Sequence, residues 1–160
     1  MDNLTQIPLT LYLGVAGAAI GTTTTTTIAN TNSYCIKGKA YSKTAASNGA
    51  TPTLDSNTGL AFVAIPVNKA SVHVLCLDSG GTIRAVQGTI VDYTDAGVFS
   101  VSAPQFPTIP DTLCPFAYEL TKVISTGSAW TMGVSNQATL TGVTHVFVDC
   151  VTLPERPQVS

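Results

Sequence analysis

The chain has 160 residues, of which 10% are charged and 44% are hydrophobic, and its formal net charge is −2. An average soluble domain has about 25% charged residues, so the surface of this chain is built mainly from Thr, Ser, Asn, Gln and Gly. The composition excludes intrinsic disorder, and the lack of a basic run excludes nucleic acid as a partner. So little charge makes a free monomer poorly soluble, and we therefore expect other subunits to cover much of the surface.

Residues 1–32 are predicted to form an N-terminal arm. The segment Leu9–Ile20 is apolar but shorter than the roughly 20 residues that span a bilayer, so no membrane partner is expected. Six threonines follow, and their β-branched side chains favour an extended backbone that pairs with the edge of a neighbouring chain. In the alternative interpretation, the same residues form an ordinary first strand of the domain. The candidate partner-binding residues are Leu9, Leu11, Tyr12, Leu13, Val15, Ile20, Thr22, Thr23, Thr24, Thr25, Thr26 and Thr27.

Residues 33–153 have the pattern of one antiparallel β domain. Val, Ile, Thr, Tyr and Phe are frequent there, and Gly and Pro recur at short intervals, as in strands joined by turns. The fold class is therefore predicted to be all-β, an antiparallel β-sandwich or small β-barrel with an extended N-terminal arm. Residues 154–160 are interpreted as a Pro-containing C-terminal tail.

Short strands at Tyr34–Tyr41 and Leu60–Ile65 are predicted first, with a polar loop, Ser42–Gly59, between them. The clearest element is a hairpin at Ser71–Val91. Its turn, Asp78–Gly81, is rich in residues that tolerate positive φ, as tight hairpin turns require.

The first strand of this hairpin is predicted to lie centrally in a sheet. Both of its faces are largely apolar, so both are expected to be covered. One face carries Val72, Val74 and Cys76, and the other carries His73, Leu75 and Leu77.

The second half of the domain begins with a short predicted strand at Val98–Val101. Four prolines make Ala103–Pro115 irregular. A second hairpin is predicted from Ala117–Ile124 and Trp130–Val134, and a final strand at Val143–Leu153.

No arrangement of residues points to catalysis. His73 and His145 fall inside apolar strands, and the sequence has neither GxSxG nor HExxH. His145 and Asp149 lie about 13 Å apart along one strand, too far to share a metal ion. Most acidic residues lie in turns, where Asp bonds to the local backbone. We therefore expect no enzyme, no cofactor and no metal site.

The four cysteines, Cys35, Cys76, Cys114 and Cys150, are 36 to 41 residues apart, so they form no CxxC motif. They are interpreted as small buried hydrophobic residues in a reducing compartment, although the even count also allows two disulfides. Trp130 is the only tryptophan. It is expected in the core, with an interface anchor as the alternative.

Five segments carry a family resemblance. They are Tyr34–Tyr41 (YCIKGKAY), Thr51–Phe62 (TPTLDSNTGLAF), Ala85–Ile90 (AVQGTI), Phe106–Tyr118 (FPTIPDTLCPFAY) and Leu153–Gln158 (LPERPQ). In this order, the chain resembles small virion structural proteins of tailed bacteriophages, particularly those that decorate or cement the capsid. The resemblance implies a β-rich, often trimeric protein that binds a preformed icosahedral shell and engages the coat protein through an extended terminal arm.

The expected function is that of a non-enzymatic virion structural protein that binds and reinforces the outer surface of a phage capsid. The expected partners are the major capsid protein and copies of this chain, as a homotrimer. The expected location is the capsid surface, after assembly in the bacterial cytoplasm.

Two alternatives remain open. One is another phage structural component, such as a head fibre, tail or adaptor part. The other is a carbohydrate-binding or adhesin-like β module, which needs exposed aromatic residues. The aromatic residues available for this are Tyr41, Tyr93, Tyr118 and Trp130.

Overall fold

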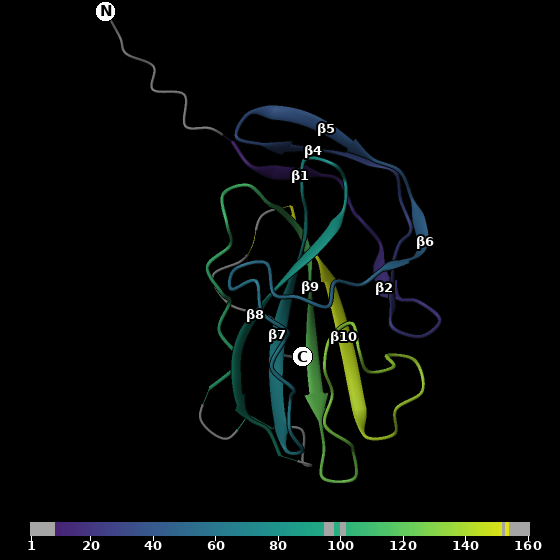
Figure 1. Cartoon of the computed structure of the whole chain (residues 1–160), viewed down its shortest axis with the longest axis vertical. Helices are drawn as coiled ribbons and strands as arrows, with labels where there is room; N and C mark the ends of the chain where they lie inside the picture. The colour runs from purple at the N-terminus through teal and green to yellow at the C-terminus, as the bar shows by residue number, and fades with distance from the viewer. Residues whose placement is uncertain (1–8, 95–97, 100–101, 152, 154–160) are drawn as a thin grey trace, which may run out of the picture.

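The computed structural model describes residues 9–94, 98–99, 102–151 and 153, and this part of the chain is all-β (Figure 1). Its strands form three antiparallel sheets, none of which closes into a barrel, so the predicted all-β antiparallel fold is confirmed. The central sheet has the order β10 (Val143–Asp149), β9 (Cys114–Val123), β7 (Lys69–Leu77), β8 (Ile83–Asp92). One small sheet contains β1 (Leu11–Leu13), β4 (Asn32–Ile36) and β5 (Lys39–Lys43), and the other contains β2 (Ala18–Ile20), β3 (Thr25–Ile28) and β6 (Ala46–Ala50).

The hairpin predicted at Ser71–Val91 is present as β7 and β8. The Asp78 side chain organises its turn, because one carboxylate oxygen accepts hydrogen bonds from the backbone N–H groups of Gly80 and Thr82, at 2.9 and 3.0 Å. Gly81 has a φ of 75°, the left-handed conformation that a residue without a Cβ adopts at little cost.

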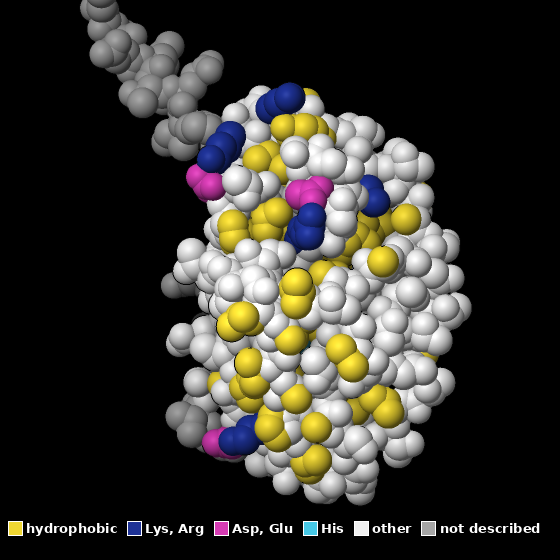
Figure 2. All heavy atoms as spheres, viewed as in Figure 1, with side chains coloured by type: hydrophobic (Ala, Val, Ile, Leu, Met, Phe, Trp, Pro, Cys, Tyr) yellow, Lys and Arg dark blue, Asp and Glu magenta, His cyan; other side chains and the backbone are white. Residues whose placement is uncertain are grey.

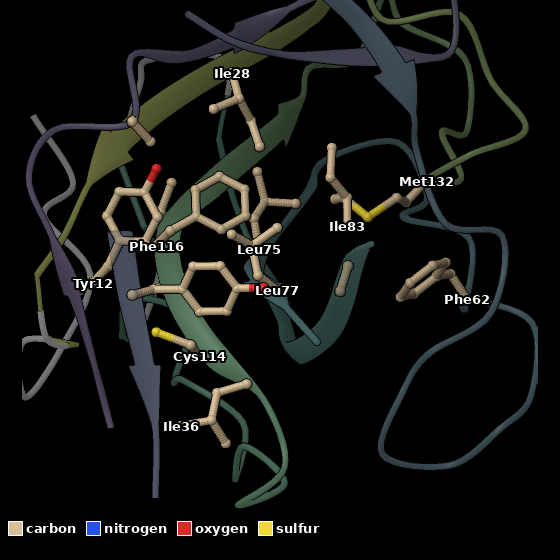
Figure 3. Close-up of a cluster of buried hydrophobic side chains, with 14 of the residues drawn as sticks. Tyr12, Ile28, Ile36, Phe62, Leu75, Leu77, Ile83, Cys114, Phe116 and Met132 are labelled. Carbon is tan, nitrogen blue, oxygen red and sulfur yellow. The ribbon is translucent and has the colours of Figure 1, made fainter. Parts of the chain in front are cut away.

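Both faces of β7 are covered, as predicted, and β7 lies between β9 and β8. Val72, Val74 and Cys76 belong to a smaller hydrophobic cluster on one face. Leu75 and Leu77 belong to the main core on the other face, where side chains from the two small sheets meet the central sheet (Figure 3).

The described part of the N-terminal segment, residues 9–32, is built into this domain. There β1 pairs with β4, and β3 pairs with β6. Tyr12 is fully buried, and its ring centroid lies 5.8 Å from that of Phe116 and 6.5 Å from that of Tyr34 (Figure 3). These residues therefore form strands of the domain and do not extend from it as an arm. The low charge that suggested cover by a partner also suits cover by the chain's own core.

The Asp149 carboxylate ties the N-terminal strands to β10. Its two oxygens accept hydrogen bonds from the backbone N–H groups of Gly17 and Ala18, at 3.0 and 3.1 Å. Replacing Asp149 with Ala should lower the free energy of unfolding by about 1.5–3 kcal/mol, because the bonds to a charged group are lost and two N–H groups remain without a partner. Urea denaturation measures this loss. An Asp149→Ala protein no less stable than the exposed-site variant Asp111→Ala would show that this carboxylate is not an anchor.

Three predicted elements differ in the structure. The polar loop Ser42–Gly59 contains β6, which pairs with β3. The strand predicted at Leu60–Ile65 is reduced to isolated bridges, one of which joins Ile65 to Trp130. Residues Trp130–Val134 do not form a return strand beside β9, because β10 occupies that edge of β9.

A fourth element, the single strand predicted at Tyr34–Tyr41, is a hairpin in the structure, because a left-handed turn at Lys37 and Gly38 divides it between β4 and β5. Of the segment Ala103–Pro115, predicted to be irregular, residues 103–113 contain no strand, but β9 begins at Cys114 and includes Pro115. Residues 100–101 of a predicted strand and the predicted tail, 154–160, lie outside the described residues.

Candidate functional site

The core face of the central sheet has an apolar half and a polar half. The two small sheets pack on the apolar half. The polar half is contacted by two irregular segments, the β6–β7 connection (residues 51–68) and the β9–β10 connection (residues 124–142). Its polar side chains are Ser71 and His73 on β7, Glu119 and Thr121 on β9, and His145 on β10.

Glu119 is the centre of this polar cluster. Its side chain is fully buried, and Oε1 accepts hydrogen bonds from Nδ1 of His145 at 2.6 Å and from the Thr121 hydroxyl at 3.2 Å. Oε2 accepts a longer bond, 3.5 Å, from Nε2 of Gln137, whose backbone N–H donates to the Thr23 carbonyl at 2.9 Å. Glu119 therefore connects β9, β10 and the β9–β10 connection.

His73 lies opposite Glu119 in the register of β7 and β9. Neither of its ring nitrogens has a hydrogen-bond partner among the described residues. Its ring packs against those of Phe62 and Trp130, each at a centroid distance of 5.6 Å. Burial lowers the pKa of His73 to about 4; the Glu119 carboxylate opposes this change and the His145 ring adds to it. His73 is therefore neutral at pH 7.

The contact between Glu119 and His145 has the geometry of a general-base pair, but solvent does not reach it. The exposed fraction is 0% for the Glu119 side chain and 1% for that of His145. Trp130 covers the His145 ring at a centroid distance of 4.9 Å. In the part of the chain that the structure describes, no group of three or more His, Cys, Asp or Glu residues is arranged to hold a metal ion. In this conformation the polar cluster contacts only other parts of the fold, including the two connections that cover it.

Both histidines lie in strands that were predicted to be apolar, and no sequence motif singled out Glu119. The one available signal was a carboxylate between Tyr118 and Leu120 in a strand of mostly uncharged residues. A charge in such a strand is rarely buried without a partner. However, the identity of that partner depends on the register of β9 and β10.

The predicted partner-binding residues are separated by the structure. Tyr12 and Thr26 are buried, and the Thr26 hydroxyl is 2.7 Å from that of Thr51. Thr22 and Thr23 are exposed. Five candidates are half-buried, namely Leu11, Ile20, Thr24, Thr25 and Thr27. Among these candidates, the exposed apolar residues are Leu9 (56%), Leu13 (50%) and Val15 (61%), all in or next to β1.

The face of the β1–β4–β5 sheet that points away from the core carries no charged side chain. Tyr12 and Tyr34 point into the core, so their neighbours along each strand point outward. Leu11, Cys35 and Ala40 form one row across the sheet, and Leu13, Ser33 and Ser42 form the next. We call these six residues the outer face.

A second exposed apolar surface lies on the β6–β7 connection, which passes in front of β7 and β8 in Figure 1. Its most exposed residues are Leu60 (69%), Val63 (63%) and Leu54 (53%). In Figure 2, charged side chains gather near the top and at one lower edge, and scattered hydrophobic side chains occupy the surface between them.

A groove of about 400 Å³ lies beside Leu54 and is also lined by Asp55, Asp78 and Arg84. Its carboxylates are already engaged. Asp55 accepts three backbone hydrogen bonds, and Asp78 accepts bonds from its own turn and from Nε of Arg84 at 3.0 Å. The carboxylates of the groove are therefore already used within the fold.

The aromatic residues available for stacking on a sugar are covered. Tyr118 and Trp130 have an exposed fraction of 0%, and Tyr93 of 8%. Tyr41 is half-buried and stacks on Tyr34 at a centroid distance of 5.4 Å. None of them offers an open ring face to a carbohydrate.

The four cysteines are free thiols, three of them buried and Cys35 half-buried. Burial raises the pKa of Cys114 and of Cys150 to about 12, so neither is a thiolate at neutral pH. These two, with Cys76, occupy the core as small apolar side chains, as predicted.

Comparison with known proteins finds no matching family model, no similar curated protein and no similar solved structure. Among the described residues, there is no helix with the length and hydropathy needed to cross a membrane.

Proposed function

We propose that this chain is a non-enzymatic virion structural protein that binds and reinforces the outer surface of a phage capsid. The resemblance of its segments to capsid decoration proteins supports this proposal. The observation that carries it is the uncharged outer face of the β1–β4–β5 sheet.

The outer face suits a permanent protein contact. Leu11 and Leu13 supply apolar area, whose burial contributes about 25 cal/mol per Å², and Leu9 and Val15 extend this area along β1. Because none of the six side chains is charged, covering the face requires no desolvation of ions. The contact residues of the proposal are therefore Leu9, Leu11, Leu13 and Val15 from the predicted set, and not the buried Tyr12.

A homotrimer strengthens such a contact. Three copies of the outer face dock on adjacent coat subunits at once, so weak single contacts give strong total binding through effective concentration. Contacts between copies would also cover apolar side chains such as those of Leu60 and Val63. Reinforcement follows because the trimer bridges the seams between coat subunits.

The alternatives differ in their support. A head-fibre, tail or adaptor component could use the same outer face, and the position of the protein on the virion distinguishes it from a decoration protein. A carbohydrate-binding module is less well supported, because Tyr118 and Trp130 are fully buried.

The test is co-sedimentation of the purified protein with empty capsid shells of the phage that encodes it. The wild type should sediment with the shells, and Leu13→Asp should reduce the bound fraction at least tenfold, because it places a charge in the middle of the contact. The matched control is Val134→Asp, at a site that is 67% exposed and distant in sequence from β1. Equal binding by Leu13→Asp and Val134→Asp would rule out the outer face as the contact, and no binding by the wild type would rule out the function.

A further inference from the structure

Apolar and polar contacts hold the β9–β10 connection over the polar cluster, and its Trp130 and Met132 side chains are fully buried in the main core. Trp130 exchanges two backbone hydrogen bonds with Ile65, at 2.7 and 3.0 Å. The Gln137 side chain donates a hydrogen bond to Glu119 in the sheet, and its backbone N–H donates one to the Thr23 carbonyl. The connection itself, residues 124–142, contains no Asp, Glu, Lys, Arg or His. The charged group that Gln137 contacts therefore belongs to the sheet.

The cluster beneath the connection is incompletely paired. Among the described residues, both ring nitrogens of His73, Nε2 of His145, Nε1 of Trp130 and Oε1 of Gln137 are buried without a hydrogen-bond partner. Unpaired buried polar groups are costly in a closed structure and regain water when it opens. Opening of this half of the core would therefore return water to five unpaired polar atoms.

From this arrangement we propose that the Glu119–His145 pair and His73 form a pH-sensitive latch, which holds the β9–β10 connection closed at neutral pH and releases it in acid while the central sheet stays paired. The latch is independent of the proposed capsid function, because none of its residues belongs to the outer face.

The charges that face the latch come from each element packed on it. β7 supplies His73, β9 supplies Glu119, β10 supplies His145, and the β6–β7 connection supplies Asp55, which acts on His73 electrostatically. At neutral pH, Glu119 holds His145 and Gln137, and His73 is neutral. Acid adds a proton to His73, whose buried ring nitrogens have no hydrogen-bond partner among the described residues, so the closed arrangement becomes unfavourable.

The direction of the pH effect follows from His73. Its pKa is about 4 in the closed structure, because burial disfavours the charged ring, against an ordinary value of 6.5 in water. The open form therefore binds a proton first as the pH falls below 6.5, and opening becomes steadily easier down to about pH 4. The contribution of a neutral His73 to the stability of the closed form is therefore fully present above pH 6.5 and is lost as the pH falls to about 4.

Trp130 reports on the latch directly, since it is the only tryptophan and its ring contacts both histidines. Fluorescence quenching by acrylamide measures the access of solvent to this ring, and far-ultraviolet circular dichroism measures the sheet. Between pH 7 and 4, the quenching constant should rise severalfold while the circular dichroism stays constant.

Two substitutions should move this transition in opposite directions. His73→Phe keeps the aromatic contact with Trp130 but cannot take up a proton, so the midpoint should fall to lower pH. Glu119→Gln removes the carboxylate that faces both histidines, so the midpoint should rise. Asp92→Asn removes an exposed carboxylate paired with Lys69 and should leave the midpoint unchanged.

Three results would overturn the latch. In the first, Trp130 stays protected in the wild type until the sheet signal is lost. In the second, His73→Phe opens at the same pH as the wild type. In the third, Asp92→Asn shifts the midpoint as far as Glu119→Gln does. The wild-type comparison of the two signals decides the matter even if a variant does not fold.

Discussion

Replacing Tyr12 with Ala should lower the free energy of unfolding by about 3–5 kcal/mol, the range for loss of a large buried aromatic side chain. Tyr12 has an exposed fraction of 0% and packs between the rings of Tyr34 and Phe116. Ala would leave a cavity where β1 meets β9, and neighbouring strands fix the walls of that cavity. Urea or thermal denaturation of the purified protein measures the loss.

The neighbouring residue provides the matched control. Leu13 lies in the same strand with its side chain pointing outward and half exposed, so Leu13→Ala should change stability by less than about 0.5 kcal/mol. Similar small losses for both variants would mean that β1 is not part of the core. The segment would then be free to act as the arm that its composition suggested.

Replacing Glu119 with Ala should lower the free energy of unfolding by about 3–5 kcal/mol, as expected when one partner of a buried pair is removed. His145 and Thr121 would lose their acceptor, and Gln137 would lose its tie to the sheet. Glu119→Gln should cost less, because the amide keeps one acceptor oxygen. Chemical denaturation at pH 7 compares the two.

An exposed ion pair shows what a carboxylate contributes without burial. Asp92 pairs with Lys69 at the surface, and Asp92→Ala should cost at most about 1 kcal/mol. A loss for Glu119→Ala no larger than that for Asp92→Ala would mean that the polar cluster does not hold the β9–β10 connection.

Local pattern was enough to predict the elements whose neighbours lie close in the chain. The β7–β8 hairpin follows from two alternating strands and a turn of Asp, Ser and Gly, and its two covered faces follow from apolar residues on both. The irregular stretch before β9 follows from its prolines. These features depend on residues at most about 20 positions apart.

Features that depend on distant partners could not be predicted in the same way. A charge-poor segment is suited both to a partner's surface and to its own core, and only the pairing of β1 with β4 and the packing of Tyr12 on Phe116 show which applies. β9 pairs with β10 rather than with residues near Trp130 because a longer strand is available 20 residues after β9 ends. Likewise, the contact of Glu119 with His145 exists only in that register.

The proposed contact between the outer face and the coat protein is tested most directly by electron cryomicroscopy of purified shells saturated with the protein. We expect added density on the outside of the shell at local symmetry axes, with the outer face of the β1–β4–β5 sheet against the coat protein. Density at the tail, or density on the shell with the outer face turned to solvent, would contradict the proposal.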